Sequence, residues 1–262
     1  MARYLVTGAA GGMGTAICRA LTDAGHEVFG LDRTRPAAEP PWHLLAADLT
    51  DSASLQAALR LVGESGPLDG VIHAAGLYDL NSLLEIDEEA FVRIFNVNLF
   101  GVYRVNKLAV PLLAPGARCV IITSELAPLD PLPFTGLYAV TKTALETYAY
   151  SLRMEMQLLG RPVSVVRPGA VNTGMLPSSL RALERFCTGT GLYPVHAERF
   201  RRIVQRVEAR SVTPDKLAQK VLRVLRAKRP RFVYNLNRNP LLRLLSALPR
   251  RLQLWIIRRI LS

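Results

Sequence analysis

Cysteine is scarce in this sequence, and its pattern excludes two classes of protein. The 262 residues contain three cysteines, Cys18, Cys119 and Cys187, which lie far apart and form no C-x-x-C pair. An odd number of isolated cysteines argues against a disulfide scaffold and against a zinc site, and it fits a reducing compartment. The four histidines have no ligand spacing either, so we expect no metal centre.

Long apolar runs are missing as well. Half of the residues are apolar, yet the apolar stretches are interrupted and fall well short of the ~18 consecutive residues of a membrane-spanning helix. The first predicted strand starts directly after Met1–Arg3, so we expect no secretory signal. These absences predict a cytoplasmic protein that is soluble or peripheral at a membrane.

Acidic residues are absent after Asp215. The formal net charge is +12, but the chain through Asp215 has 20 basic against 21 acidic residues, and residues 216–262 add 13 basic ones. The excess positive charge therefore belongs to the end of the chain and not to its whole surface. Aromatic residues are sparse there and no recognition module accompanies the charge, so we expect no nucleic-acid partner.

What is present is an alternation of short β-branched or apolar runs with longer helical patterns, up to about residue 235. This order predicts a doubly wound, seven-stranded parallel sheet of the Rossmann type, with helices on both faces. Strands are expected near residues 3–7, 27–32, 43–47, 69–74, 117–123, 162–167 and 231–235. Helices are expected to begin near Met13, Ser52, Asp87, Gly136 and Thr213, and residues 172–212 are expected to be irregular.

A glycine-rich turn follows the first strand. Gly8, Gly11, Gly12 and Gly14 come directly after Thr7, where they allow a tight turn and let the N–H groups of a helix N-terminus approach a pyrophosphate. An acidic residue that binds ribose hydroxyls is typical about 20 positions further on, and Asp32 ends the second strand. Together these features predict dinucleotide binding.

The spacing T-G-x-x-x-G-x-G resembles that of the short-chain dehydrogenase/reductase family. Residues 138–142, Tyr-Ala-Val-Thr-Lys, match the family's Y-x-x-x-K motif. Ser124 precedes them at a strand end, and Asn98 lies on the preceding helix. The resemblance extends from Tyr4 to about Tyr234, and it implies a homo-oligomeric NAD(P)-dependent oxidoreductase.

The resemblance also implies a set of functional residues. Tyr138 would exchange the substrate's proton, Lys142 would lower the pKa of Tyr138, Ser124 would bind the substrate oxygen, and Asn98 would hold a water that relays protons. The implied cofactor contacts come from the strand ends and loops: Gly8, Gly12, Met13, Gly14, Asp32, Arg33, Asp48, Leu49, Ala75, Gly76, Tyr138, Lys142, Pro168, Gly169, Val171 and Thr173. In this interpretation residues 1–235 form the catalytic domain, with a substrate lid at about 175–212, and residues 236–262 form a basic helical tail.

Two departures from the family pattern concern the site. Residues 73–76 are His-Ala-Ala-Gly where the family usually has Asn-Asn-Ala-Gly, so the amide side chains are lost. Ser124 and Tyr138 are 14 positions apart, one more than the common spacing. Thr123 is a second hydroxyl at this strand end and stays the alternative to Ser124.

The acidic residue bears on the choice of cofactor. A carboxylate at Asp32 can accept from both ribose hydroxyls of NAD and would repel a 2′-phosphate. Gly11, where many NADP-dependent relatives carry a basic residue, offers no counter-charge. We therefore expect NAD, while Arg33 and Arg35 keep NADP as an alternative.

Apolar residues dominate the segments that would border the substrate. These are Leu126, Leu129, Leu132, Pro133 and Phe134, and the segment Met175–Val195. Their character predicts an apolar alcohol or ketone of steroid, retinoid or lipid type, although the same residues also suit ordinary core and lid contacts. The rival to an enzyme is a non-catalytic dinucleotide-binding sensor or membrane-peripheral scaffold on the same fold.

The last segment, 249–261, has the pattern of a cationic amphipathic helix. At 100° per residue the wheel gathers six apolar side chains on one arc, Leu252, Leu254, Ile256, Ile257, Ile260 and Leu261. Arg251, Arg258 and Arg259 lie opposite, with Trp255 among them. The pattern suits an anchor on an anionic membrane surface, and it suits equally a helix packed on its own domain or on a second subunit.

Overall fold

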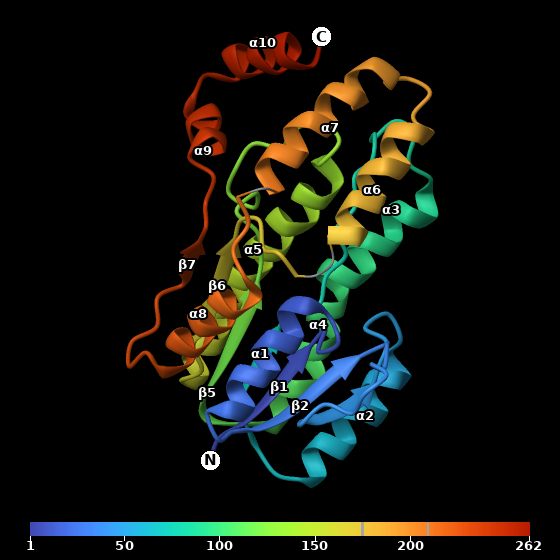
Figure 1. Ribbon diagram of the computed structural model, residues 1–262. Helices are drawn as coiled ribbons and strands as arrows, with labels where there is room; N and C mark the ends of the chain where they lie inside the picture. Colours follow the sequence, from blue (N-terminus) through green and yellow to red (C-terminus); the bar gives the residue numbers. More distant parts are fainter. Residues whose placement is uncertain (174–175, 209) are drawn as a thin grey trace.

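Seven strands form one parallel sheet in the computed structural model, which describes residues 1–173, 176–208 and 210–262 (Figure 1). Their order across the sheet is β3-β2-β1-β4-β5-β6-β7. The bounds are β1 Arg3–Thr7, β2 Glu27–Asp32, β3 His43–Ala46, β4 Leu68–His73, β5 Leu113–Ile122, β6 Val163–Pro168 and β7 Val233–Leu236. The predicted doubly wound sheet is confirmed, and its chain order reverses between β1 and β4, where such sheets bind ligands.

Helices cover both faces of this sheet. The side chains of α1 (Gly12–Asp23) and α8 (Pro214–Arg226) pack on one face, and those of α2 (Ser52–Glu64), α4 (Gly101–Ala109) and α5 (Gly136–Met156) pack on the other. Before α4 come α3 (Glu88–Phe95) and a π-helical turn, η1 (Asn96–Phe100). The remaining helices are α6 (Leu176–Gly189), α7 (Pro194–Glu208), α9 (Pro240–Ala247) and α10 (Arg250–Leu261), with short 3₁₀ segments η2 (Val110–Leu112) and η3 (Gln157–Leu159).

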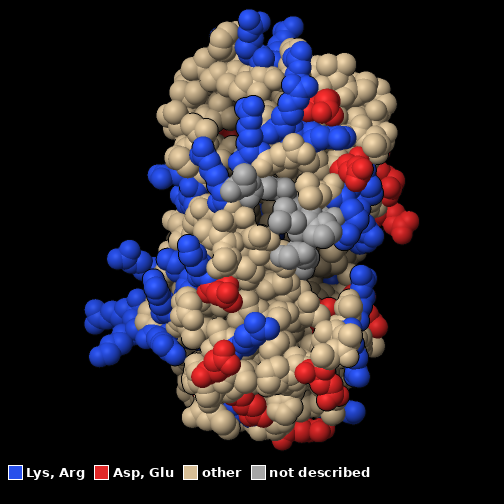
Figure 2. Space-filling view, viewed as in Figure 1, with Lys and Arg blue, Asp and Glu red and all other residues tan. Residues whose placement is uncertain are grey.

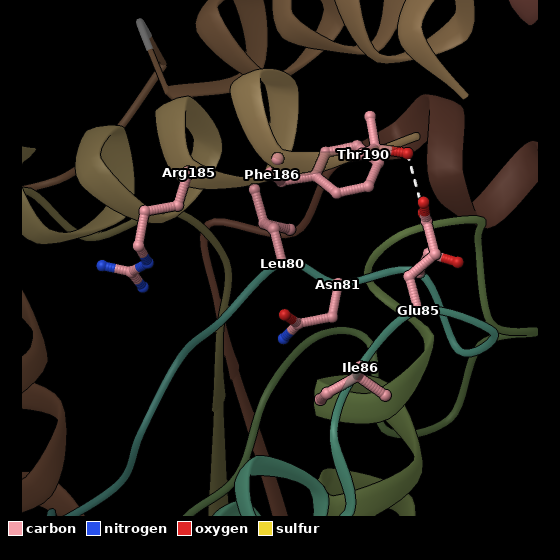
Figure 3. A pocket seen from close by; sticks show the side chains of 9 residues that line it. Leu80, Asn81, Glu85, Ile86, Arg185, Phe186 and Thr190 are labelled. Atoms are coloured by element: carbon pink, nitrogen blue, oxygen red, sulfur yellow. Dashed lines mark hydrogen bonds between the residues drawn. The ribbon is translucent and has the colours of Figure 1, made fainter. Parts of the chain in front are cut away.

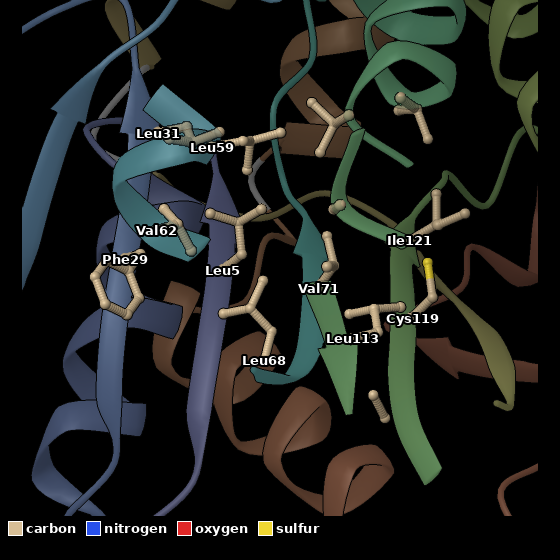
Figure 4. Close-up of a cluster of buried hydrophobic side chains, with 14 of the residues drawn as sticks. Leu5, Phe29, Leu31, Leu59, Val62, Leu68, Val71, Leu113, Cys119 and Ile121 are labelled. Carbon is tan, nitrogen blue, oxygen red and sulfur yellow. The ribbon is translucent and has the colours of Figure 1, made fainter. Parts of the chain in front are cut away.

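The strands bury alternate side chains on the two faces. Leu5, Val71 and Ile121 point to the side of α2, α4 and α5 (Figure 4), while Val6 and Ile72 point to the side of α1 and α8. Each is at most 1% exposed. Burial of one such side chain stabilises the fold by roughly 1.5–3 kcal/mol, so two continuous apolar layers hold the helices against both faces of the sheet.

Aspartate side chains cap the starts of two helices. The Asp51 carboxylate accepts from the Ala53 N–H at the start of α2, and the Asp87 carboxylate accepts from the Ala90 N–H at the start of α3. Pro214 takes the first position of α8. In contrast, α1 begins after Gly11 and no side chain caps it.

The structure differs from the predicted elements in two places. Strand β5 begins at Leu113, four residues early, because its pairing with β4 shifts register between Leu68 and Gly70, and Gly116 has a φ of +75°. Residues 172–212 are not irregular: α6 and α7 lie within them. Apolar side chains at 197, 200 and 204 had the helical spacing that indicates α7.

Helices α6 and α7 stand over the carboxyl ends of the strands (Figure 1). Phe186, Ala197 and Phe200 pack around Phe134, whose ring centroid lies 4.5 Å from that of Phe186. Phe134 has a φ of +65°, a left-handed conformation that is costly for a bulky residue and that this aromatic packing holds in place. Met175, the first residue of the expected lid, lies outside the described residues.

The C-terminal helices lie against the upper end of the molecule in Figure 1, and α10 packs on α7. Only part of the apolar arc of this helix faces the protein. Ile256, Ile257 and Leu261 are partly buried, whereas Leu252, Leu254 and Ile260 are exposed. The reason is that Gln253, 6% exposed, occupies the centre of the inward face, where its amide binds Asp130. Within the described part of the chain, no helix has the length and apolar character needed to cross a membrane.

A small polar network is buried inside the apolar layer below the site. His73 at the end of β4 donates from Nε2 to Asn106 Oδ1 at 2.8 Å, and Asn106 Nδ2 donates to the Tyr148 hydroxyl at 3.2 Å. Burial lowers the pKa of His73 to about 4. The imidazole therefore replaces the amide that the family has at this position, and it is neutral at physiological pH.

This burial predicts a loss of stability in acid. The folded pKa of about 4 lies below the ordinary value of 6.5, so the unfolded chain binds the proton more tightly, and His73 costs stability as the pH falls from 6.5 toward 4. At pH 5 the cost is about 2 kcal/mol relative to neutral pH. Urea unfolding at pH 7 and pH 5 should show this loss in the wild type and not in His73→Asn. An equal loss in both proteins would contradict the prediction.

Candidate active site

The residues predicted to act together follow the ends of four neighbouring strands. Gly8 follows β1, Gly76 follows β4, Ser124 follows β5 and Gly169 follows β6. Because all strands are parallel, their carboxyl ends meet at one edge of the sheet, beneath α6 and α7 (Figure 1). The structure thus brings the glycine-rich turn and the catalytic candidates to one place.

The glycine-rich turn needs its glycines for geometric reasons. Gly8 has a φ of +72°, and a Cβ there would lie 2.7 Å from backbone atoms of Ala75. A Cβ at Gly14 would lie 2.0 Å from the Gly8 carbonyl oxygen. The Asp32 carboxylate accepts from the Ala10 N–H at 2.9 Å, which fixes the turn against the end of β2.

These residues fit a dinucleotide. The N-terminus of α1 has no capping side chain, so its first N–H groups at Gly12, Met13 and Gly14 suit a pyrophosphate. The loop after β6 approaches them closely, since a Cβ on Gly12 would lie 2.1 Å from the Thr173 carbonyl oxygen. The remaining cofactor candidates border the same edge: Arg33, Asp48, Leu49, Ala75, Gly76, Pro168, Gly169 and Val171.

The carboxylate of Asp48 is engaged locally. It accepts from the Thr50 N–H at 2.8 Å and from the Thr50 hydroxyl at 2.7 Å, and these bonds lower its pKa. Leu49 follows and contacts α4, because a Cβ on Gly101 would lie 2.9 Å from the Cβ of Leu49. The side chains at 48 and 49 therefore shape the loop after β3.

Tyr138, Ser124 and Lys142 form the chemical centre of this edge. The Ser124 hydroxyl lies beside the Tyr138 hydroxyl and lowers the pKa of that phenol. Lys142 lies one helical turn after Tyr138 on α5, with its Nζ 5.7 Å from the centre of the Tyr138 ring. The Lys142 ammonium donates to the Ile122 carbonyl at 3.2 Å, which holds it at the end of β5.

Burial sets the protonation of these groups. It raises the pKa of Tyr138 to about 12, and the bond to Ser124 lowers that pKa in part. Burial lowers the pKa of Lys142 to about 8. Burial is the largest influence on the pKa of Tyr138 and leaves it a neutral phenol at pH 7, while a lowering of this pKa by Lys142 stays a prediction.

Asn98 is fully buried within η1 and fastens three elements together. Its Oδ1 accepts from the Leu77 N–H at 2.7 Å, and its Nδ2 donates to the Leu77 carbonyl and to the Thr141 hydroxyl, both at 3.0 Å. The loop after β4 is thereby tied to α5, one residue before Lys142. The side chain is used in this clamp, and its expected role of holding a water stays a prediction.

The two hydroxyls at the end of β5 are now distinguished. The Ser124 hydroxyl lies beside that of Tyr138. The Thr123 hydroxyl instead donates to the Glu146 carboxylate and to the Val166 carbonyl, with a distance of 3.3 Å in each case. The longer spacing between Ser124 and Tyr138 does not separate them, because the loop between them folds into turns at Ala127 and Leu129.

Three residues of this neighbourhood had no sequence signal. The ring of Tyr78 meets that of Tyr138 edge to face, with centroids 5.0 Å apart. Thr141 pairs with Asn98, and the buried Glu125 carboxylate accepts from the Asn239 N–H at 2.6 Å. Each depends on a contact between segments far apart in the chain, which spacing within one segment does not reveal.

A pocket of about 220 Å³ lies between the loop after β4 and α6 (Figure 3). Leu80, Asn81 and Glu85 line one side, and Arg185, Phe186 and Thr190 line the other. Glu85 accepts from the Thr190 hydroxyl at 2.7 Å and from two N–H groups before α7. The pocket does not include Tyr138 or Ser124, so it is not the site of the chemistry. Its polar contacts attach the segment between α6 and α7 to the loop after β4.

Comparison with known proteins gives consistent results. The sequence profile of the short chain dehydrogenase family matches residues 3–183. The chain is 30% identical over 234 residues to a 3-ketodihydrosphingosine reductase of Bacteroides thetaiotaomicron, covering 87% of this chain and 85% of that protein. It is 30% identical over 210 residues to human 17-beta-hydroxysteroid dehydrogenase type 1, covering 78% and 63%. The fold matches an aldohexose dehydrogenase of Thermoplasma acidophilum with a TM-score of 0.76, at 20% identity and 91% and 95% coverage.

Proposed function

The chain belongs to the short chain dehydrogenase family, as an NAD(P)-dependent oxidoreductase acting on alcohol or carbonyl groups, and we propose that its substrate is apolar and that Tyr138 is its general acid and base. The observation that carries the second part is the placement of Ser124 and Lys142 beside the phenol of Tyr138. A binding role alone makes no demand on these three side chains, which argues against a non-catalytic sensor or scaffold.

In the proposed reduction, the Tyr138 hydroxyl donates its proton to the carbonyl oxygen of the substrate, while Ser124 hydrogen-bonds the same oxygen. The raised pKa of Tyr138 keeps this proton in place at neutral pH, ready for donation as negative charge develops. Lys142 stabilises the phenolate left behind. The nicotinamide supplies or accepts the hydride when bound. In the reverse direction the phenolate form of Tyr138, stabilised by Lys142, accepts the proton of the alcohol.

We assign the cofactor candidates to this cofactor by position. Gly12, Met13 and Gly14 would offer N–H groups to the pyrophosphate, and Asp32 would accept from the ribose hydroxyls of the adenosine. Gly76 lies near both Lys142 and Asn98, since a Cβ on it would be 3.3 Å from Lys142 Nζ. Pro168, Gly169, Val171 and Thr173 would border the nicotinamide half.

An apolar substrate is supported by the aromatic residues at this end of the molecule. The rings of Phe134, Phe186 and Phe200 pack together beneath α6 and α7, and Tyr78 borders the tyrosine itself. Two relatives are named for a ketodihydrosphingosine and a hydroxysteroid, which are apolar molecules carrying one reactive oxygen. We propose a steroid-, retinoid- or lipid-like carbonyl or secondary alcohol.

Two partners complete the proposal. Exposed apolar side chains along α3, η1, α4 and α5 support a homo-oligomer, because such a surface is rarely left in water: Phe91, Phe100, Tyr103, Val140 and Met154. The second partner is an anionic membrane surface at segment 249–261, which is argued in the next subsection. Nucleic acid is not proposed.

Replacing Tyr138 tests the mechanism. Tyr138→Phe removes the exchanged proton but keeps the ring, so turnover of a responsive apolar ketone should fall by about 10³-fold or more while NAD affinity changes little. A screen of apolar ketones and alcohols, followed by cofactor absorbance in both directions, identifies the responsive substrate. Tyr150→Phe on the same helix, where the ring is 53% exposed, is the matched control and should keep full activity. Near-normal turnover by Tyr138→Phe would overturn the mechanism.

The cofactor proposal has its own test. NAD should bind at least about tenfold more tightly than NADP, because a 2′-phosphate beside the Asp32 carboxylate is repelled across a few ångströms. Calorimetric titration of both cofactors measures this directly. Asp32→Ala should narrow the preference for NAD over NADP, whereas Asp23→Ala, at the C-terminal end of α1 and far from the N-terminus that faces the cofactor, should not. Tighter binding of NADP by the wild type would contradict the proposal and indicate Arg33 as the partner of the phosphate.

A further inference from the structure

We propose that the outward face of α10 docks on an anionic phospholipid bilayer and that it turns the mouth of the active site toward the lipid. The docking face consists of Arg251, Leu252, Leu254, Trp255, Arg258 and Arg259. Docking itself rests on the chemistry of this surface. Only its consequence, delivery of an apolar substrate from the bilayer, rests on the proposed function.

The two sides of α10 differ in what they contact. Gln253 and Leu261 face the protein, where Gln253 binds Asp130 at 2.9 Å and the Leu261 carbonyl is bonded to His196 at 2.6 Å. On the outward side Leu254 is 68% exposed and Trp255 is 63% exposed. The helix is therefore already held by its own domain, and its outward side still presents large apolar side chains to solvent.

Arginine and apolar side chains alternate on this outward side. Arg251, Arg258 and Arg259 are all exposed and stand around Trp255. A tryptophan flanked by leucines suits the headgroup boundary of a bilayer, and guanidinium groups suit its phosphates. The preceding α9 adds Leu241 and Leu244, which are 65% and 63% exposed and share one face at a spacing of three.

The distribution of charge identifies the partner as anionic. Of the 13 basic residues after Asp215, seven lie in 216–231, on α8 and the turn before β7, and six lie in the tail 236–262. Figure 2 shows Lys and Arg side chains at the upper end, where α7 and α10 lie, and separately at the left beside that turn. Only the tail group combines positive charge with exposed tryptophan and leucine, so a bilayer suits it better than a purely polar anion.

The docking face is fixed relative to the catalytic centre. The Glu125 carboxylate, next to Ser124, accepts from the Asn239 N–H at the start of α9 at 2.6 Å. Further along the same loop the Asp130 N–H donates to the Ser246 hydroxyl at 3.3 Å. These bonds tie α9 and α10 to the loop between Ser124 and Tyr138. A bilayer against α10 would consequently lie over the carboxyl end of the sheet, where substrate must enter.

Flotation with vesicles tests the docking. The full chain, in a Trp42→Phe background, is mixed at low salt with phosphatidylcholine vesicles or with vesicles containing 30% phosphatidylglycerol. We expect binding to the anionic vesicles, weakened by salt, and a blue shift of Trp255 fluorescence on binding. Arg258→Gln with Arg259→Gln should weaken binding roughly 30-fold, and Leu254→Ser with Trp255→Ser should weaken it at least as much.

Matched changes elsewhere serve as controls. Lys228→Gln with Arg229→Gln removes two positive charges from the turn before β7, as many as the arginine pair of the tail. Leu158→Ser removes a leucine that is 82% exposed after α5. Both control variants should bind anionic vesicles like the parent protein. Tyr138→Phe should also bind, which separates this test from that of catalysis.

The proposal is overturned if the full chain stays soluble with anionic vesicles at low salt, or if the control charge pair weakens binding as much as the tail pair. Soluble protein whose sedimentation shifts to monomer on Leu254→Ser with Trp255→Ser would identify the face as a subunit contact instead.

Discussion

The side chain of Asn98 is the contact on which the arrangement of the site depends. It is buried in a π-helical turn, and it uses its amide to bind both polar groups of the Leu77 backbone and the hydroxyl of Thr141. An unpaired backbone group at such a depth would cost roughly 1–3 kcal/mol, so the three bonds are strongly favoured together. Through them the loop after β4, the turn η1 and helix α5 keep one relative position.

That position determines the chemistry of the neighbouring groups. Thr141 precedes Lys142, and Leu77 precedes Tyr78, so the clamp fixes the elements that place a cation and an aromatic edge against Tyr138. The same enclosure raises the pKa of Tyr138 and lowers that of Lys142, so that the phenol keeps its proton and the ammonium is poised to lose one. Rigid packing and altered protonation thus have a common origin in burial.

The sequence predicted the parts that depend on local pattern. The doubly wound parallel sheet and the convergence of Gly8, Ser124 and Tyr138 follow from periodicity and from the topology of parallel sheets. It did not predict contacts made across the chain. The inward turn of Gln253, the bond from Glu125 to Asn239 and the packing of Phe134 under α6 and α7 depend on how distant segments meet. A helical wheel places Gln253 within the apolar arc, but it does not reveal the partner, Asp130, that allows a polar side chain to be buried there.

Hydrogen exchange at the Leu77 amide measures the clamp most directly. Our central claim is that the Asn98 side chain, by holding this amide, positions the loop after β4 against α5. In Asn98→Ala the exchange of a peptide spanning residues 74–80 should accelerate about a hundredfold, while peptides from β1 stay protected. Asn96→Ala, which removes a contact to Arg104 on the same turn, should leave the peptide unchanged. Unaltered exchange of the Leu77 amide in Asn98→Ala would contradict the account.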